Sequence, residues 1–186
     1  MFKAKIEDLN MNSQPVKASA AKGIRQQVLD TYPNIAEYLD DIWPKKAKVY
    51  TLKFKGEVID SELHLNFIQV EEEILFLQMR DKAILPMLRL LHKYPIMMNQ
   101  MQCDKGAIKH IFSGSNVMAP GLISEGGRCV EGLEVGAPVA VMAEGKKHAM
   151  AVGYLTMSSK DIKSVGKGFA IEVIQFLNDA LWKDVK

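Results

Sequence analysis

The chain has 186 residues, 48% of them apolar, and a formal net charge of only +2 at pH 7. This apolar content is enough for one large core or two small ones and argues against a disordered protein. The small net charge does not indicate a nucleic-acid binder, so any RNA contact has to come from a local patch or from shape.

Neither the cysteines nor the termini indicate an extracytoplasmic protein. The two cysteines form no CxxC pair and the four histidines have no metal-ligand spacing, so we expect no disulfide framework and no metal site. The segment Met1–Asp8 has no apolar core, and no run approaches the roughly 20 apolar residues of a membrane span. We therefore expect a cytoplasmic protein with no membrane contact.

The first half of the chain has alternating helical and extended patterns. Apolar residues at intervals of four predict a helix from Val16 to Thr31, with Pro15 in its first turn. Asn34 is expected to cap a second helix that reaches Ile42.

Alternating apolar residues then predict three strands, over 48–55, 62–70 and 74–79. Between the last two, Glu71-Glu72 is a poor tight turn, so we expect a longer loop. A helix is predicted over 84–94, with Pro86 near its start.

The second half begins after an expected domain junction at 95–102 and holds most of the glycines. Strands are predicted over 139–143, 149–157 and 169–176. A capping-box sequence at 158–161 and a C-terminal Gly166 predict a short helix between the last two strands.

The stretch from Cys103 to Gly121 is the part of the sequence that is most informative about function. Its first part predicts a short helix with Lys105 and Lys109 one turn apart on one side. The opposite, apolar side consists of Ala107, Ile108, Ile111 and Phe112. Ser113-Gly114 is expected to end this helix, a short strand to follow from Asn116, and Pro120-Gly121 to turn the chain. A row of lysines beside a glycine-flanked strand can bring positive charge and bare main chain to one surface, and such a surface can bind the phosphate backbone of a nucleic acid.

These residues resemble the opening motif of a PUA domain, a small pseudobarrel RNA-binding module. Their sequence is similar to that of the malignant T-cell-amplified sequence family, in which a PUA domain follows a small N-terminal domain. The motif residues are 104–109, Ser113-Gly114, Asn116, Met118 and Pro120-Gly121. Further similar stretches occur in the same order at 1–3, 44–46, 88–95, 142–146 and 178–182, so the resemblance covers nearly the whole chain.

The resemblance implies an α+β fold, with a small N-terminal α/β domain at 1–95 and a C-terminal PUA-type pseudobarrel at 99–182. It implies a non-catalytic translation factor without a cofactor, which binds RNA of the small ribosomal subunit. Such a factor would act in initiation, reinitiation and post-termination tRNA removal, near the tRNA acceptor end, with density-regulated protein as its partner.

The candidate RNA-binding residues are Lys105, Lys109, Ser113, Gly114, Asn116, Met118, Pro120, Gly121, Lys146 and Lys147. Each also has a structural interpretation. The lysines fit solvated faces, the glycines fit backbone geometry, and Asn116 could satisfy main-chain groups at a strand edge.

Two other functions remain open at this point. PUA domains often end RNA-modification enzymes, so the chain could be an accessory or specificity subunit of one. However, residues 1–99 contain no nucleophile motif and no Gly-rich motif. The modest charge also fits a protein-interaction module whose PUA fold has lost RNA affinity.

Overall fold

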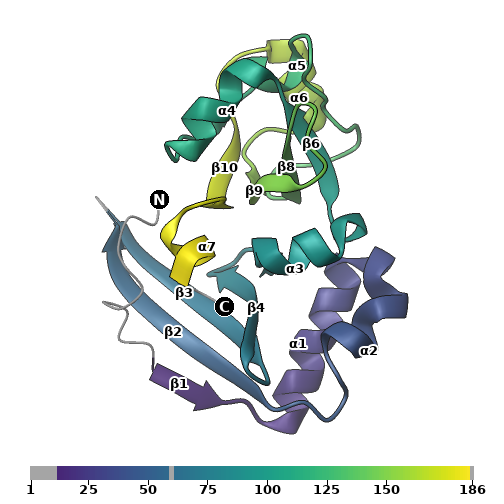
Figure 1. Cartoon of the computed structure of the whole chain (residues 1–186), viewed down its shortest axis with the longest axis vertical. Coiled ribbons are helices and arrows are strands. Elements are labelled where there is room, and N and C mark those ends of the chain that lie inside the picture. The colour runs from purple at the N-terminus through teal and green to yellow at the C-terminus, as the bar shows by residue number, and fades with distance from the viewer. Residues whose placement is uncertain (1–11, 59–60, 185–186) are drawn as a thin grey trace.

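The computed structural model describes residues 12–58 and 61–184, which form two five-stranded sheets, one above the other in Figure 1. The expectation that Met1–Asp8 is no secretory signal lies outside these residues. None of the helices in the described ranges has the length and apolar character needed to cross a membrane.

The first sheet is antiparallel throughout, in the order β1-β2-β3-β4-β5. Its strands are β1 (Asn12–Pro15), β2 (Val49–Val58), β3 (Ser61–Val70), β4 (Glu73–Met79) and β5 (Leu85–Pro86). The three strands predicted from alternation are thereby confirmed as β2, β3 and β4.

The first predicted helix is present and ends at Thr31 as expected, but the predictions for Pro15 and Asn34 are wrong. The helix α1 (Ala18–Thr31) begins later than Val16, because Pro15 pairs with Tyr50 in the sheet and the Val16 N–H donates to the Val49 carbonyl at 2.9 Å. Asn34 caps no helix. It lies inside the 3₁₀ helix η2 (Pro33–Tyr38), which α2 (Leu39–Ile42) follows.

The loop expected between β3 and β4 is instead a tight turn of Glu71 and Glu72. Glu71 adopts a left-handed conformation with φ 54°, which is uncommon for a residue with a side chain. Hydrogen bonds to Lys48 hold it there, because the Lys48 N–H donates to Glu71 Oε1 at 2.8 Å and the Glu71 N–H donates to the Lys48 carbonyl at 2.8 Å. A contact distant in sequence therefore stabilises a turn that local preference disfavours.

The helix predicted over 84–94 is shorter than expected. Leu85 and Pro86 form the edge strand β5, where a proline is tolerated because its missing N–H would face away from the ladder. The helix α3 (Leu88–Lys93) starts only after Met87, whose N–H donates to the Leu75 carbonyl at 2.8 Å. The 3₁₀ helix η3 (Pro95–Met97) then leads into the second sheet.

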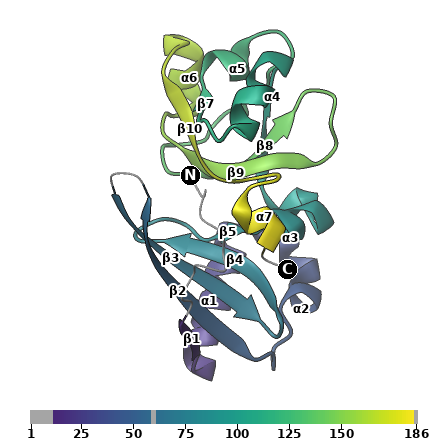
Figure 2. The ribbon, with the colours of Figure 1, turned by 60° about the vertical axis from the view of Figure 1, so that its left-hand side comes forward.

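The second sheet has the order β6-β8-β9-β10-β7 and curls into a half-barrel (Figure 2). Its strands are β6 (Asn99–Cys103), β7 (Val117–Met118), β8 (Pro138–Ala143), β9 (Ala149–Leu155) and β10 (Phe169–Phe176). The accompanying helices are α4 (Lys105–Phe112), α5 (Pro120–Ile123), α6 (Ser159–Val165) and α7 (Ala180–Asp184). The predictions of β8, β9, β10 and α6 are confirmed, and Gly166 ends α6 with φ 64°.

A continuous core joins the two halves of the molecule. Tyr154 of β9 is buried, and its hydroxyl donates to the Ala83 carbonyl at 2.6 Å. His92 of α3 donates from Nε2 to the Ala149 carbonyl at 2.8 Å. The last helix, α7, buries Leu181 completely in the core of the first sheet. The two sheets are therefore held in a defined relation by packing and by hydrogen bonds.

Candidate nucleic-acid interface

The helix α4 is fixed at its N-terminus by Asp104. The Asp104 carboxylate accepts the Ala107 N–H at 2.8 Å and the Ser124 hydroxyl, which lies just after α5. The hydrogen bond from Ser124 and those from backbone N–H groups lower the pKa of Asp104 from its ordinary value. The ionised carboxylate thus ties the start of α4 to the end of α5.

The predicted row of lysines is present on the exposed side of α4, but its two members differ. Lys105 donates from its backbone N–H to Glu144 Oε2 at 3.2 Å, and its Nζ lies 3.5 Å from Glu144 Oε1. This ion pair is solvent-exposed on the Lys105 side and therefore weak. Lys109 is exposed and has no carboxylate within 4.0 Å among the described residues. Lys109 is the freer of the two charges.

The β8–β9 turn holds Lys146 and Lys147, both exposed as expected. The same turn includes Glu144, whose carboxylate contacts Lys105. The turn that carries these two lysines therefore lies next to the first residue of α4.

At the end of α4, the backbone N–H groups of Ser113 and Gly114 already have partners. The Ser113 N–H donates to the Lys109 carbonyl at 3.2 Å and the Gly114 N–H to the Ile111 carbonyl at 2.8 Å. Both N–H groups are used within the helix terminus, where carbonyls and not N–H groups face outward. Gly114 does end the helix, with φ 83°. The backbone at Ser113 and Gly114 thus offers RNA no free donor.

Asn116 contributes to the sheet. Its Oδ1 accepts the Val173 N–H at 3.0 Å, beside a register shift in β10. This contact matches the structural interpretation of Asn116. The amide nitrogen has no hydrogen-bond partner in the described part of the chain, and Asn116 is one of the residues that line a pocket.

The predicted Pro120-Gly121 turn is wrong. Pro120 begins α5, a position that suits a residue without an N–H, and Gly121 is buried inside that helix. An added Cβ at Gly121 would lie 3.2 Å from the Ala107 Cβ, so glycine allows α5 to pack closely on α4. Phe112, expected on the apolar side of α4, is 45% exposed, whereas Ile111 is buried.

A pocket of about 500 Å³ opens beside α4. Its lining includes Gly106, His110, Asn116, Met118, Gly121 and Phe169. Phe169 and Met118 pair across β10 and β7 and are 61% and 44% exposed, so they form an apolar rim. Sequence reasoning missed Phe169, because an aromatic residue that begins a predicted strand is more often part of a core.

This arrangement suits a nucleic acid that presents an unstacked base. Exposed aromatic and thioether side chains offer a flat apolar surface for an unstacked base, and α4, which borders this pocket, also bears Lys105 and Lys109. Among the described residues, His, Cys, Asp and Glu side chains form no cluster that could hold a metal ion.

Two family models match the chain in succession, a Pre-PUA-like domain over residues 5–95 and a PUA domain over residues 99–177. Solved structures agree with this arrangement. A hypothetical protein of Pyrococcus horikoshii superposes with a TM-score of 0.70 at 25% identity, covering 94% of this chain and 100% of that one. A conserved PUA domain protein of Thermoplasma acidophilum, at 20% identity, shares the fold with a TM-score of 0.62 and coverages of 94% and 100%.

Sequence relatives extend over almost the full length. Malignant T-cell-amplified sequence 1 of Danio rerio is 43% identical over 183 residues, which cover 98% of this chain and 97% of the relative. The Drosophila melanogaster homolog is 44% identical over 184 residues, with the same coverages. Malignant T-cell-amplified sequence 2 of Homo sapiens is 43% identical over 171 residues, covering 92% and 90%. The chain therefore belongs to the malignant T-cell-amplified sequence family and consists of a Pre-PUA domain followed by a PUA pseudobarrel.

Proposed function

We propose that this chain is a non-catalytic translation factor that docks on RNA of the small ribosomal subunit through its PUA domain. The family and the PUA domain support an RNA-binding, translation-related and non-catalytic protein. The observation that carries the proposal is the pocket beside α4, where the exposed Phe169 and Met118 adjoin the helix that bears Lys105 and Lys109.

In this proposal the two domains have separate roles. Residues 1–95 bind a partner protein, and residues 99–182 contact RNA. The factor acts in the cytoplasm in initiation, reinitiation and post-termination tRNA removal, together with density-regulated protein. An unpaired base enters the pocket beside α4, while the lysines contact its backbone. An irregular ribosomal RNA segment or a tRNA acceptor end provides such unpaired bases.

Phe169→Ala tests the base-stacking part of the proposal. Stacking on an aromatic side chain is worth about 1–3 kcal/mol per base, so affinity for purified small subunits should fall about 5- to 150-fold. Val135→Ala is the matched control, because Val135 is an exposed apolar residue outside the pocket lining. Equal affinities of both variants in a sedimentation titration would show that Phe169 stacks on no base.

The partner surface that we propose is the apolar cluster of Tyr38 and Tyr94 in the N-terminal domain and Ile96 directly after it. Tyr38 and Ile96 are 39% and 50% exposed, although both are large apolar residues. The rings of Tyr38 and Tyr94 lie 5.6 Å apart, and the Asn34 amide donates to the Ile96 carbonyl at 3.2 Å. These contacts link η2 to η3 and give the cluster a defined shape.

Tyr38→Glu with Ile96→Glu should therefore abolish capture of density-regulated protein by the full chain, while small-subunit binding persists. Burying two charges at an interface costs more than the exposed apolar contacts contribute. Val135→Glu with Val165→Glu places the same charges on exposed valines of the PUA domain. If only this second variant loses the partner in a pull-down, the partner binds the PUA domain instead.

A further inference from the structure

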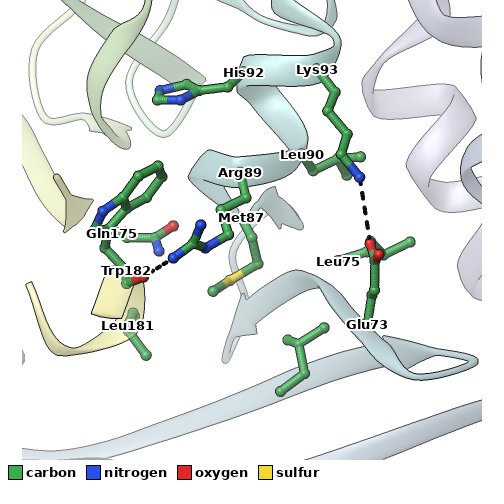
Figure 3. Close-up of a pocket in the computed structure, with 11 residues that line it drawn as sticks. Glu73, Leu75, Met87, Arg89, Leu90, His92, Lys93, Gln175, Leu181 and Trp182 are labelled. Carbon is green, nitrogen blue, oxygen red and sulfur yellow. Dashed lines mark hydrogen bonds and ion pairs between the residues drawn. The ribbon is translucent and has the colours of Figure 1, made fainter. Parts of the chain in front are cut away.

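A second pocket, of about 400 Å³, lies where the two halves of the molecule meet (Figure 3). It is bounded by α3, by the start of β4, and by the segment from β10 to α7. Its floor is apolar and is formed by Leu75, Met87, Leu90 and Leu181. A volume in this range is typical of small-molecule sites, which are frequent at domain junctions.

The most informative group in this pocket is Gln175. Its side chain is buried, with 1% exposure, and its Oε1 accepts the Leu88 N–H at 2.9 Å. That bond assigns the oxygen and nitrogen, because only the oxygen can accept an N–H. The Nε2 group donates to no partner among the described residues, and because no buried side-chain nitrogen or oxygen there lacks a partner, this group faces the open pocket that Gln175 lines. This amide N–H is therefore available to a ligand acceptor in the pocket.

Arg89 provides a cation at the same pocket. Its guanidinium lies 4.4 Å from the centre of the Trp182 ring and donates one hydrogen bond, at 2.7 Å, to the Trp182 carbonyl. These two contacts orient the group, and a guanidinium has five N–H donors in all. The structure of residues 12–58 and 61–184 gives this guanidinium no other hydrogen bond, so its remaining donors are available to a ligand.

The other charged groups leave the pocket with an excess of positive charge. The Nζ of Lys93 lies 3.8 Å from Oε2 of Glu73, so these two opposite charges offset each other. Both side chains are largely exposed. Burial, the largest influence, lowers the pKa of His92 and so favours its neutral form. The charge of Arg89 is therefore not matched by a carboxylate in the pocket lining.

We propose that this pocket binds a small organic carboxylate, with its apolar body on the floor and its carboxylate bound by Arg89 and Gln175. A carboxylate accepts the planar guanidinium fork and an amide N–H together. The ligand would touch α3 of the first half and the β10–α7 segment of the second, so its binding would stabilise their packing. This site is separate from the pocket beside α4 and does not depend on the proposed RNA function.

Phenylacetate and phenylacetamide form a matched pair of probes for the full-length chain. They share an apolar ring and differ in charge, so calorimetric titration separates carboxylate recognition from apolar binding. We expect phenylacetate to bind with a dissociation constant of about 1 mM or lower, and at least about tenfold more tightly than phenylacetamide. Equal affinities, or no phenylacetate binding at about 10 mM, would overturn the proposal.

Two variants test the residues. Gln175→Glu keeps the acceptor for Leu88 but replaces the free donor with an anionic oxygen, and Arg89→Gln removes the cation. Each should weaken phenylacetate binding at least about tenfold, whereas Lys22→Gln, on the exposed face of α1, should not. Circular dichroism establishes which variants fold. Undiminished binding by a folded Arg89→Gln variant would contradict the proposal even if Gln175→Glu fails to fold.

Discussion

Gly153→Ala should be severely destabilising, although it adds only one methyl group. Gly153 lies in the middle of β9, between β8 and β10. An added Cβ would lie 2.0 Å from the Glu172 carbonyl oxygen and 2.9 Å from its carbonyl carbon. Because the obstacle is backbone, no side-chain rotation can relieve it, and β9 and β10 would have to separate. We expect a loss of about 3 kcal/mol or more in the free energy of unfolding.

Gly23→Ala is the control for this prediction. Gly23 is inside α1, and an added Cβ there would meet nothing within 4 Å. The same change should therefore stabilise the helix by about 0.5–1 kcal/mol. Chemical denaturation of both variants measures the two effects. Similar unfolding midpoints would show that β10 does not approach Gly153 as closely as described.

Reversal of charge on α4 should have the second large effect. Lys105→Glu with Lys109→Glu should reduce small-subunit affinity at least about tenfold, because each lysine bound to phosphate releases counterions. Of the single variants, Lys109→Glu should cost more, since Lys105 is already paired with Glu144. The dependence of binding on salt should also flatten, by about 0.7 in logarithmic slope for each lost phosphate contact to single-stranded RNA.

Lys17→Glu with Lys22→Glu makes the same charge change on exposed positions of the first half. This control is needed because the whole protein carries a net charge of only +2, so any loss of positive charge could weaken RNA binding. Sedimentation with purified small subunits at two salt concentrations distinguishes the variants. Equal losses would mean that the lysines of α4 act only through the overall charge.

Patterns confined to one element predicted that element well. The capping box at 158–161 and Gly166 gave the bounds of α6, and alternation predicted β2, β3 and β4. The family resemblance predicted the two-part α+β organisation that the family models match. These features depend on neighbours in sequence or on a motif long enough to be specific.

The errors occurred where partners distant in sequence decide the conformation. Pro15 and Pro86 both belong to strands instead of helices, because β2 and β4 pair with them. Glu71 tolerates a left-handed turn through its bonds to Lys48. Similarly, the exposure of Phe169 depends on its place at the rim beside β7, which no local pattern indicates.

Photo-crosslinking tests most directly whether the pocket beside α4 faces RNA. A benzoyl-phenylalanine in place of Met118 would put the reactive group in the lining of this pocket, at a position that is 44% exposed. The same residue in place of Tyr38, which is 39% exposed, would put it in the N-terminal domain. After irradiation with small subunits, we expect ribosomal RNA to be attached at position 118 and not at position 38. RNA attached at position 38 and none at position 118 would contradict the proposed interface.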